Sequence, residues 1–142
     1  MKFNNYVRSA VAVALLTAFN ANAGVAVVVN PGNALTEISV KDAQRLYLGK
    51  TGKFPGGSKA EVVDQKIGES ARDTFYKGVV GKSESQAKSY WSKQIFTGKG
   101  TPPEAVGGDA EVKARVGSDP AAIGYIDASQ VDGSVKTVLM VD

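Results

Sequence analysis

The sequence has 142 residues, with 17 basic and 14 acidic side chains and with neither cysteine nor histidine. Without these two residue types the chain cannot form disulfides, a Ser-His-Asp or Cys-His catalytic group, or most zinc sites. We therefore expect a protein that is not an enzyme, that has no metal site or cofactor, and that is held together by packing alone.

The first 23 residues have the pattern of a secretory signal peptide. Lys2 and Arg8 supply a positive segment, residues 11–16 supply an apolar core, and residues 21–23 (Ala-Asn-Ala) form an A-x-A cleavage site. We expect cleavage at this site and a periplasmic protein of residues 24–142, a length suited to one domain. Loss of the two basic residues leaves an almost balanced charge, which gives no reason to expect binding to nucleic acid.

Predicted strands and helices then alternate along the chain. Residues 25–29 are continuously apolar and β-branched, which favours a strand in the middle of a sheet that is covered on both faces. Ser39 and Asp42 have the spacing of a helix start, and Gly49 is placed to end this helix. The predicted inward face of the helix comprises Val40, Ala43, Leu46 and Tyr47.

Residues 61–80 are the stretch around which the chain is organised. Residues 61–65 indicate a short strand, residues 66–68 a turn, and residues from about 69 to 80 a helix with Phe75 on its buried face. A strand that turns through a glycine into a helix directs the first free N–H groups of the helix at one point, which favours an anion. The same arrangement is also the ordinary framework of α/β domains, and this alternative stays open.

The remainder of the chain continues the alternation. A capping box at Ser83 predicts a helix to about residue 96, whose apolar stripe favours a core position for Trp91. A loop rich in glycine and proline follows at residues 97–108, and then a short helix capped by Asp109. Residues 121–126 and 135–141 are the last predicted strands. The predicted inward residues of the two helices are Ala87, Tyr90, Trp91, Ile95, Val112 and Val116.

These elements predict an α/β fold with one mixed sheet flanked by about four helices. Their order also resembles a known family. The motifs that carry the resemblance are Val29-Asn30-Pro31, Leu46-Tyr47-Leu48-Gly49-Lys50, the strand-turn-helix with Phe75, Tyr90-Trp91-Ser92, residues 95–103 and Ile123-Gly124-Tyr125. Together they are similar to the second lobe of PstS-type phosphate-binding proteins, the substrate-binding components of phosphate ABC transporters, over residues 25–141.

The resemblance implies a single lobe of a type II periplasmic-binding-protein fold, with phosphate or another oxyanion bound at residues 65–72. The implied site comprises Gln65, Gly68, Glu69, Ser70, Ala71 and Arg72. In the family an arginine occupies the position of Gln65, and Ser-Gly-Thr occupies the positions of Glu69, Ser70 and Ala71. Glu69 therefore introduces a negative charge where the anion is expected. Ser70 and Arg72 are candidate ligands, or else an N-cap and a solvated surface charge.

Three functions remain open at this point. The first is an exported solute-binding protein for phosphate or another oxyanion, which delivers its ligand to an ABC permease. The second is an envelope interaction module that has lost ligand binding and docks on a porin or another envelope protein through an exposed apolar patch, with the loop at residues 97–108 and Phe54 as candidates. The third is a homodimer in which two lobes face each other across a rebuilt cleft.

Overall fold

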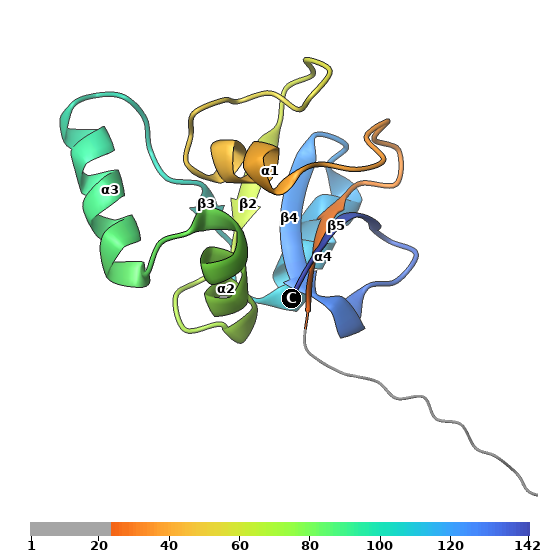
Figure 1. Ribbon diagram of the computed structural model, residues 1–142. Helices are drawn as coiled ribbons and strands as arrows, with labels where there is room; N and C mark the ends of the chain where they lie inside the picture. The colour runs from red at the N-terminus through yellow and green to blue at the C-terminus, as the bar shows by residue number, and fades with distance from the viewer. Residues whose placement is uncertain (1–23) are drawn as a thin grey trace, which may run out of the picture.

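The computed structural model describes residues 24–142, so the predicted signal peptide lies outside the described residues. Figure 1 shows one sheet with helices on both of its faces. The elements in chain order are β1 (Val25–Val29), α1 (Val40–Tyr47), β2 (Glu61–Asp64), α2 (Ser70–Phe75) with a π-helical continuation (Tyr76–Val80), α3 (Glu84–Phe96), β3 (Glu104–Ala105), α4 (Asp109–Ser118), β4 (Ala122–Asp127), a 3-10 turn (Ala128–Gln130) and β5 (Lys136–Val141).

The sheet is mixed, with the strand order β3-β2-β4-β1-β5. β1 is antiparallel to both of its neighbours, β4 and β5, whereas β2 is parallel to both β4 and β3. Parallel neighbours bring their carboxyl ends to the same edge of a sheet, and this edge is where open α/β sheets bind ligands. The turn after β2 and the end of β4 therefore lie together.

Two apolar clusters pack on the two faces of the sheet. Val25, Val27 and Val29 belong to the cluster formed with α1, α2 and the π-helical segment. Ala26 and Val28, which point the other way, belong to the cluster formed with α4. All five residues of β1 are at most 2% exposed. The prediction of a central strand covered on both faces is confirmed.

Several boundaries and side-chain positions differ from the predictions. β3 lies inside the predicted loop, because it is a two-residue strand without an apolar pattern of its own. Val40 is 45% and Ile95 is 53% exposed, so the prediction that they face the core is wrong. Val40 is the first residue of α1, and Ile95 lies near the end of α3, which lies farther from the sheet than α1 and α2 (Figure 1). No helix within residues 24–142 is long and apolar enough to cross a membrane.

Candidate functional site

The turn between β2 and α2 is fixed in place by the backbone. The Lys66 N–H donates to the carbonyl of Gly107, just before α4, at 2.9 Å. Gly68 has a φ of 104°, a conformation that side chains with a Cβ rarely adopt. The turn is therefore tied to the amino end of α4, and its shape depends on a glycine.

Three backbone donors of this turn have no acceptor. Within residues 24–142, the N–H groups of Gly68, Ser70 and Ala71 donate no hydrogen bond to the protein. Glu69 is the N-cap of α2, but its side chain makes no capping hydrogen bond. Because the first N–H groups of a helix lack intrahelical acceptors, these donors are available to a ligand or to water. The α2 helix and its π-helical continuation end at Gly81, which has a φ of 74°.

Gln65 is fully buried and serves as a junction between elements. Its Nε2 donates to Asp109 Oδ1 in α4 and to the Tyr125 carbonyl in β4, both at 2.8 Å. Its Oε1 is buried and has no hydrogen-bond partner among the described residues. The side chain therefore holds β4 and α4 together beside the turn.

Arg72 is committed to the protein's own polar groups. Its Nε and Nη2 donate to the Glu84 carboxylate at 2.5 and 2.9 Å, and its Nη1 donates to the Gln65 carbonyl at 2.7 Å. The guanidinium also lies 4.2 Å from the centre of the Tyr76 ring. Burial alone would lower the pKa of Arg72, but the hydrogen bonds to Glu84 and the nearby negative charges of Asp64 and Glu84 together outweigh it and raise this pKa.

The alternative prediction of a solvated surface charge at Arg72 is wrong, because the residue is only 9% exposed. The alternative of an N-cap at Ser70 is also wrong, since Glu69 holds that position and Ser70 is the first residue of α2. Ser70 is exposed. Its hydroxyl makes no hydrogen bond to another residue in 24–142 and is accessible from solvent.

A buried carboxylate lies directly behind the turn. Asp64 is 2% exposed and accepts hydrogen bonds from the hydroxyls of Tyr76, at 2.5 Å, and Tyr125, and from the Gln65 N–H. Its carboxylate is also 3.4 Å from the Arg72 guanidinium. Burial raises the pKa of Asp64, against the opposing effect of the two tyrosine hydroxyls and Arg72. Burial likewise raises the pKa of both tyrosines.

The sequence analysis missed this cluster. The local signal was limited to two tyrosines in apolar segments, Tyr76 and Tyr125, and to a carboxylate, Asp64, at the end of a predicted strand. Buried tyrosine hydroxyls need a partner, so the pattern indicates a buried acceptor but does not identify it.

Glu69 places a carboxylate between two helix starts. A Cβ added to Gly108, the N-cap of α4, would lie 2.7 Å from Glu69 Oε1. The Glu69 side chain therefore reaches from the start of α2 to the start of α4. A negative charge at the start of α2 opposes the binding of an anionic ligand there.

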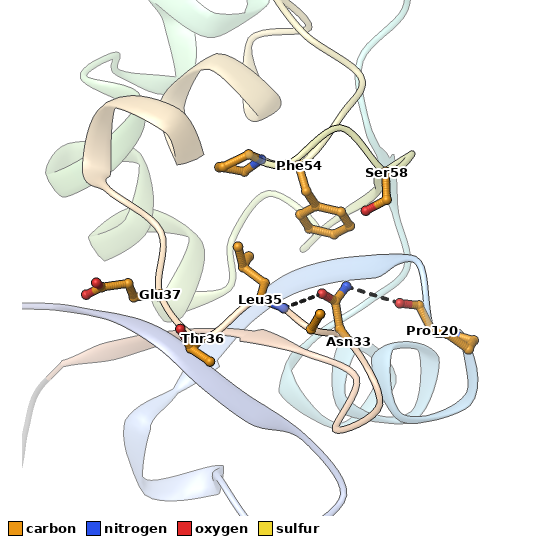
Figure 2. Close-up of a pocket in the computed structure, with 10 residues that line it drawn as sticks. Asn33, Leu35, Thr36, Glu37, Phe54, Ser58 and Pro120 are labelled. Carbon is orange, nitrogen blue, oxygen red and sulfur yellow. Dashed lines mark hydrogen bonds between the residues drawn. The ribbon is translucent and has the colours of Figure 1, made fainter.

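A second cavity lies at the opposite end of β4 (Figure 2). It has a volume of about 440 Å³ and is lined by Asn33, Leu35, Phe54 and Pro120 among others. Asn33 is fully engaged there, because its Oδ1 accepts from the Leu35 N–H and its Nδ2 donates to the Pro120 carbonyl. Phe54 is 3% exposed, so the expectation that it contributes to an exposed patch is wrong.

No group of three or more potential ligands that could hold a metal ion occurs in the part of the chain that the structure describes. No protein-family model matches the sequence, and neither does any curated protein. Solved structures do match, over 81% of this chain.

Three of the similar structures come from Clostridium perfringens, Vibrio cholerae and Borrelia burgdorferi. A phosphate ABC transporter substrate-binding protein of Clostridium perfringens with bound phosphate has 25% identity and a TM-score of 0.65, and 44% of that protein is covered. A phosphate transport receptor of Vibrio cholerae has 20% identity and a TM-score of 0.55, with 45% covered. PstS of Borrelia burgdorferi has 14% identity and a TM-score of 0.60, with 47% covered.

This chain thus spans less than half the length of the proteins that it matches. The protein of Clostridium perfringens is a substrate-binding component of a transporter. The predicted α/β fold, with one mixed sheet flanked by about four helices, is confirmed, and within residues 24–142 the sheet has five strands and there are four α-helices. The chain is similar to a single lobe of the substrate-binding proteins of phosphate ABC transporters.

Proposed function

We propose that the protein is an exported solute-binding protein that holds phosphate or another oxyanion at the turn between β2 and α2, without catalysis. The observation that carries this proposal is the group of free N–H donors at Gly68, Ser70 and Ala71. Support comes from the likeness to a protein that has phosphate bound. An anion would receive backbone hydrogen bonds there, and the Ser70 hydroxyl is a further donor.

In this proposal Gln65 and Arg72 are positioning residues. The Arg72 guanidinium fixes the backbone at Gln65 through the 2.7 Å hydrogen bond to its carbonyl, and this backbone leads into the turn. Gln65 fixes the turn against β4 and α4. Both side chains act through the shape of the site, since their donors already have acceptors within the protein.

Glu69 weakens the binding of an anion in this arrangement. Two unit charges 4 Å apart repel each other by about 4 kcal/mol at the effective dielectric of a protein surface, before screening by salt. A helix N-terminus contributes only about 0.3–1 kcal/mol of attraction at an exposed position. We therefore expect weak binding of phosphate by the single lobe, and stronger binding when Glu69 loses its charge.

The other half of the ligand shell would come from a second protein surface. The chain covers less than half the length of the similar phosphate-binding proteins. A second copy of the chain in a homodimer, an ABC permease, a porin or another envelope protein are the candidates for the facing surface. Binding that depends on protein concentration would identify the homodimer.

Isothermal titration of the purified protein with phosphate, beside sulfate, tests the proposal. We expect saturable heat with phosphate, about tenfold tighter binding in Glu69→Gln, and weaker binding in Ser70→Ala. Glu37→Gln, an exposed glutamate outside the turn, is the matched control and should leave the affinity unchanged. No heat with either anion in both wild type and Glu69→Gln would contradict the proposal.

Export is tested separately. The A-x-A motif predicts that the protein in the envelope fraction starts at Gly24. Mass spectrometry of the intact protein from this fraction should give the mass of residues 24–142. Recovery of the uncut chain from the cytoplasm would contradict export and would leave anion binding untouched.

A further inference from the structure

A groove with apolar walls runs between α3 and the turn after β2. It has a volume of about 580 Å³, enough for several apolar side chains. Its apolar lining comprises Ile67, Ala87, Trp91, Ile95 and Pro102. The α3 residues repeat at intervals of four, so they form one stripe along the helix, and Ile67 and Pro102 form the facing wall.

Large apolar side chains around the groove are exposed. Ile67 is 73%, Ile95 is 53% and Phe96 is 90% exposed. Single exposed apolar residues are ordinary, but Ile67 and Ile95 line the same groove and Phe96 follows Ile95 at the end of α3. The exposed apolar side chains in this groove make it a candidate contact site.

The helix that forms this wall is well anchored. The Tyr90 hydroxyl donates to the Leu48 carbonyl at 2.6 Å, and Trp91 is 8% exposed, with its ring against Gly49. Glu84, at the start of α3, is held by Arg72. The groove is therefore a preformed feature of the domain, which lowers the entropy cost of binding.

Exposed lysines outnumber unpaired carboxylates around the groove, where Glu69, two residues after Ile67, is the exception. Lys88 lines it, Lys66 precedes Ile67, and Lys93 and Lys99 lie close to Phe96 in the chain. All four are exposed, and none forms an ion pair with another residue in 24–142. The one carboxylate of the lining, Glu84, is neutralised by Arg72.

We propose that this groove docks an acidic amphipathic segment of another protein, with apolar side chains in the groove and carboxylates facing the lysines. Positive charge around an apolar groove favours a negatively charged occupant. A second copy of this chain fits less well, because a two-fold contact would set the same lysines against each other. The docking function goes beyond anion binding and does not require it.

Fluorescence of Trp91 reports on occupancy directly, because it is the only tryptophan of the protein and lines the groove. The probe is a synthetic helical peptide with leucines on one face and glutamates on the other. Two control peptides replace the glutamates with lysines or the leucines with serines. We expect a saturable shift of the emission with the acidic amphipathic peptide alone, and weaker binding at high salt.

Matched variants separate the groove from the rest of the surface. Ile95→Ser should weaken peptide binding about tenfold, whereas Met140→Ser, on β5, should not. The two side chains are 53% and 54% exposed, so neither change should unfold the protein. Lys88→Glu should also weaken binding, whereas Lys41→Glu on α1 should leave it unchanged.

Three results would overturn the proposal. The first is no shift with the acidic amphipathic peptide, and the second is equal binding of the lysine peptide. The third is self-association of the wild-type protein in sedimentation that is abolished by Ile95→Ser, which would assign the groove to a second copy. The phosphate affinity of Ile95→Ser should equal that of the wild type, because Ile95 lies outside the turn that is proposed to bind anions. Each of the three results would therefore leave the anion-binding proposal untouched.

Discussion

The two sides of the carboxyl end of β2 use their polar groups in opposite ways. On the buried side, Arg72 pairs with both Asp64 and Glu84, and Asp64 also accepts from the hydroxyls of Tyr76 and Tyr125. On the exposed side, the turn from Gly68 to Ala71 keeps backbone donors without acceptors.

Within this short segment, the side chains that stabilise the fold are therefore different from the backbone groups that are free to bind a ligand. Arg72 is the cation that the sequence places at the expected anion site, yet its donors are occupied by the fold. A buried charge must be paired, so Arg72 cannot turn outward without leaving Asp64 and Glu84 uncompensated. An anion therefore has to rely on the backbone of the turn. Substitutions on the buried side should accordingly lower the free energy of unfolding, and substitutions on the exposed side should change the affinity for the anion.

The largest effect is expected for Arg72→Ala. It removes the partner of Asp64, which is 2% exposed, and of Glu84. Removing one partner of a buried ion pair costs about 3–5 kcal/mol. Urea unfolding should show this loss of stability, and Lys77→Ala, an exposed control on the same helical segment, should not. A change in Arg72→Ala no larger than in the control would contradict the structural role of the guanidinium.

Trp91→Ala tests whether α3, which lies farthest from the sheet, shares the stability of the core. The ring is 8% exposed and packs on Gly49, so the substitution should cost about 3 kcal/mol. Urea unfolding measures this cost. A near-neutral result would mean that α3 is only loosely attached and that the groove beside it is not preformed.

The buried side should also give a pH dependence. Burial raises the pKa of Asp64 above its usual value of 3.8, so the folded protein retains a proton that the unfolded chain has lost. This contribution to stability is fully present below 3.8 and is lost as the pH rises through the folded pKa. Unfolding free energies measured over this window should fall with pH, and Asp64→Asn should reduce the slope. An unchanged slope in Asp64→Asn would assign the dependence to other groups.

Ser70→Ala should have the smallest effect on stability, because Ser70 is exposed and does not cap α2. Surface substitutions of this kind usually change the free energy of unfolding by less than about 0.5 kcal/mol. The same variant should weaken phosphate binding. A large loss of stability with unchanged affinity would mean that Ser70 supports the fold and does not contact the anion.

The sequence predicted those parts of the fold that depend on local patterns. The apolar run of β1 and the capping box at Ser83 both correspond to the structure, since the Ser83 side chain accepts from the Gln86 N–H and the Gln86 side chain accepts from the Ser83 N–H. The inward position of Ile95 was wrong, because helical spacing identifies an apolar face but not what covers it. Among residues 24–142, no helix or strand covers Ile95 at the end of α3.

The candidate site was less predictable. The turn and its glycine were visible in the sequence, and the structure gives Gly68 a positive φ. The pairing of Arg72 with Glu84 was not visible, because it depends on how α3 is placed against α2. The contact of Glu69 with Gly108 joins segments 39 positions apart and likewise requires the folded chain.

The central claim is that the backbone of the turn binds the anion while Arg72 serves the fold. The most direct test is a phosphate titration of the isotopically labelled protein followed by nuclear magnetic resonance. The claim predicts saturable shifts of the amide signals of Gly68, Ser70 and Ala71, with the Arg72 Nε–H signal unchanged. A shift of the Arg72 Nε–H signal without shifts of the three amides would contradict it.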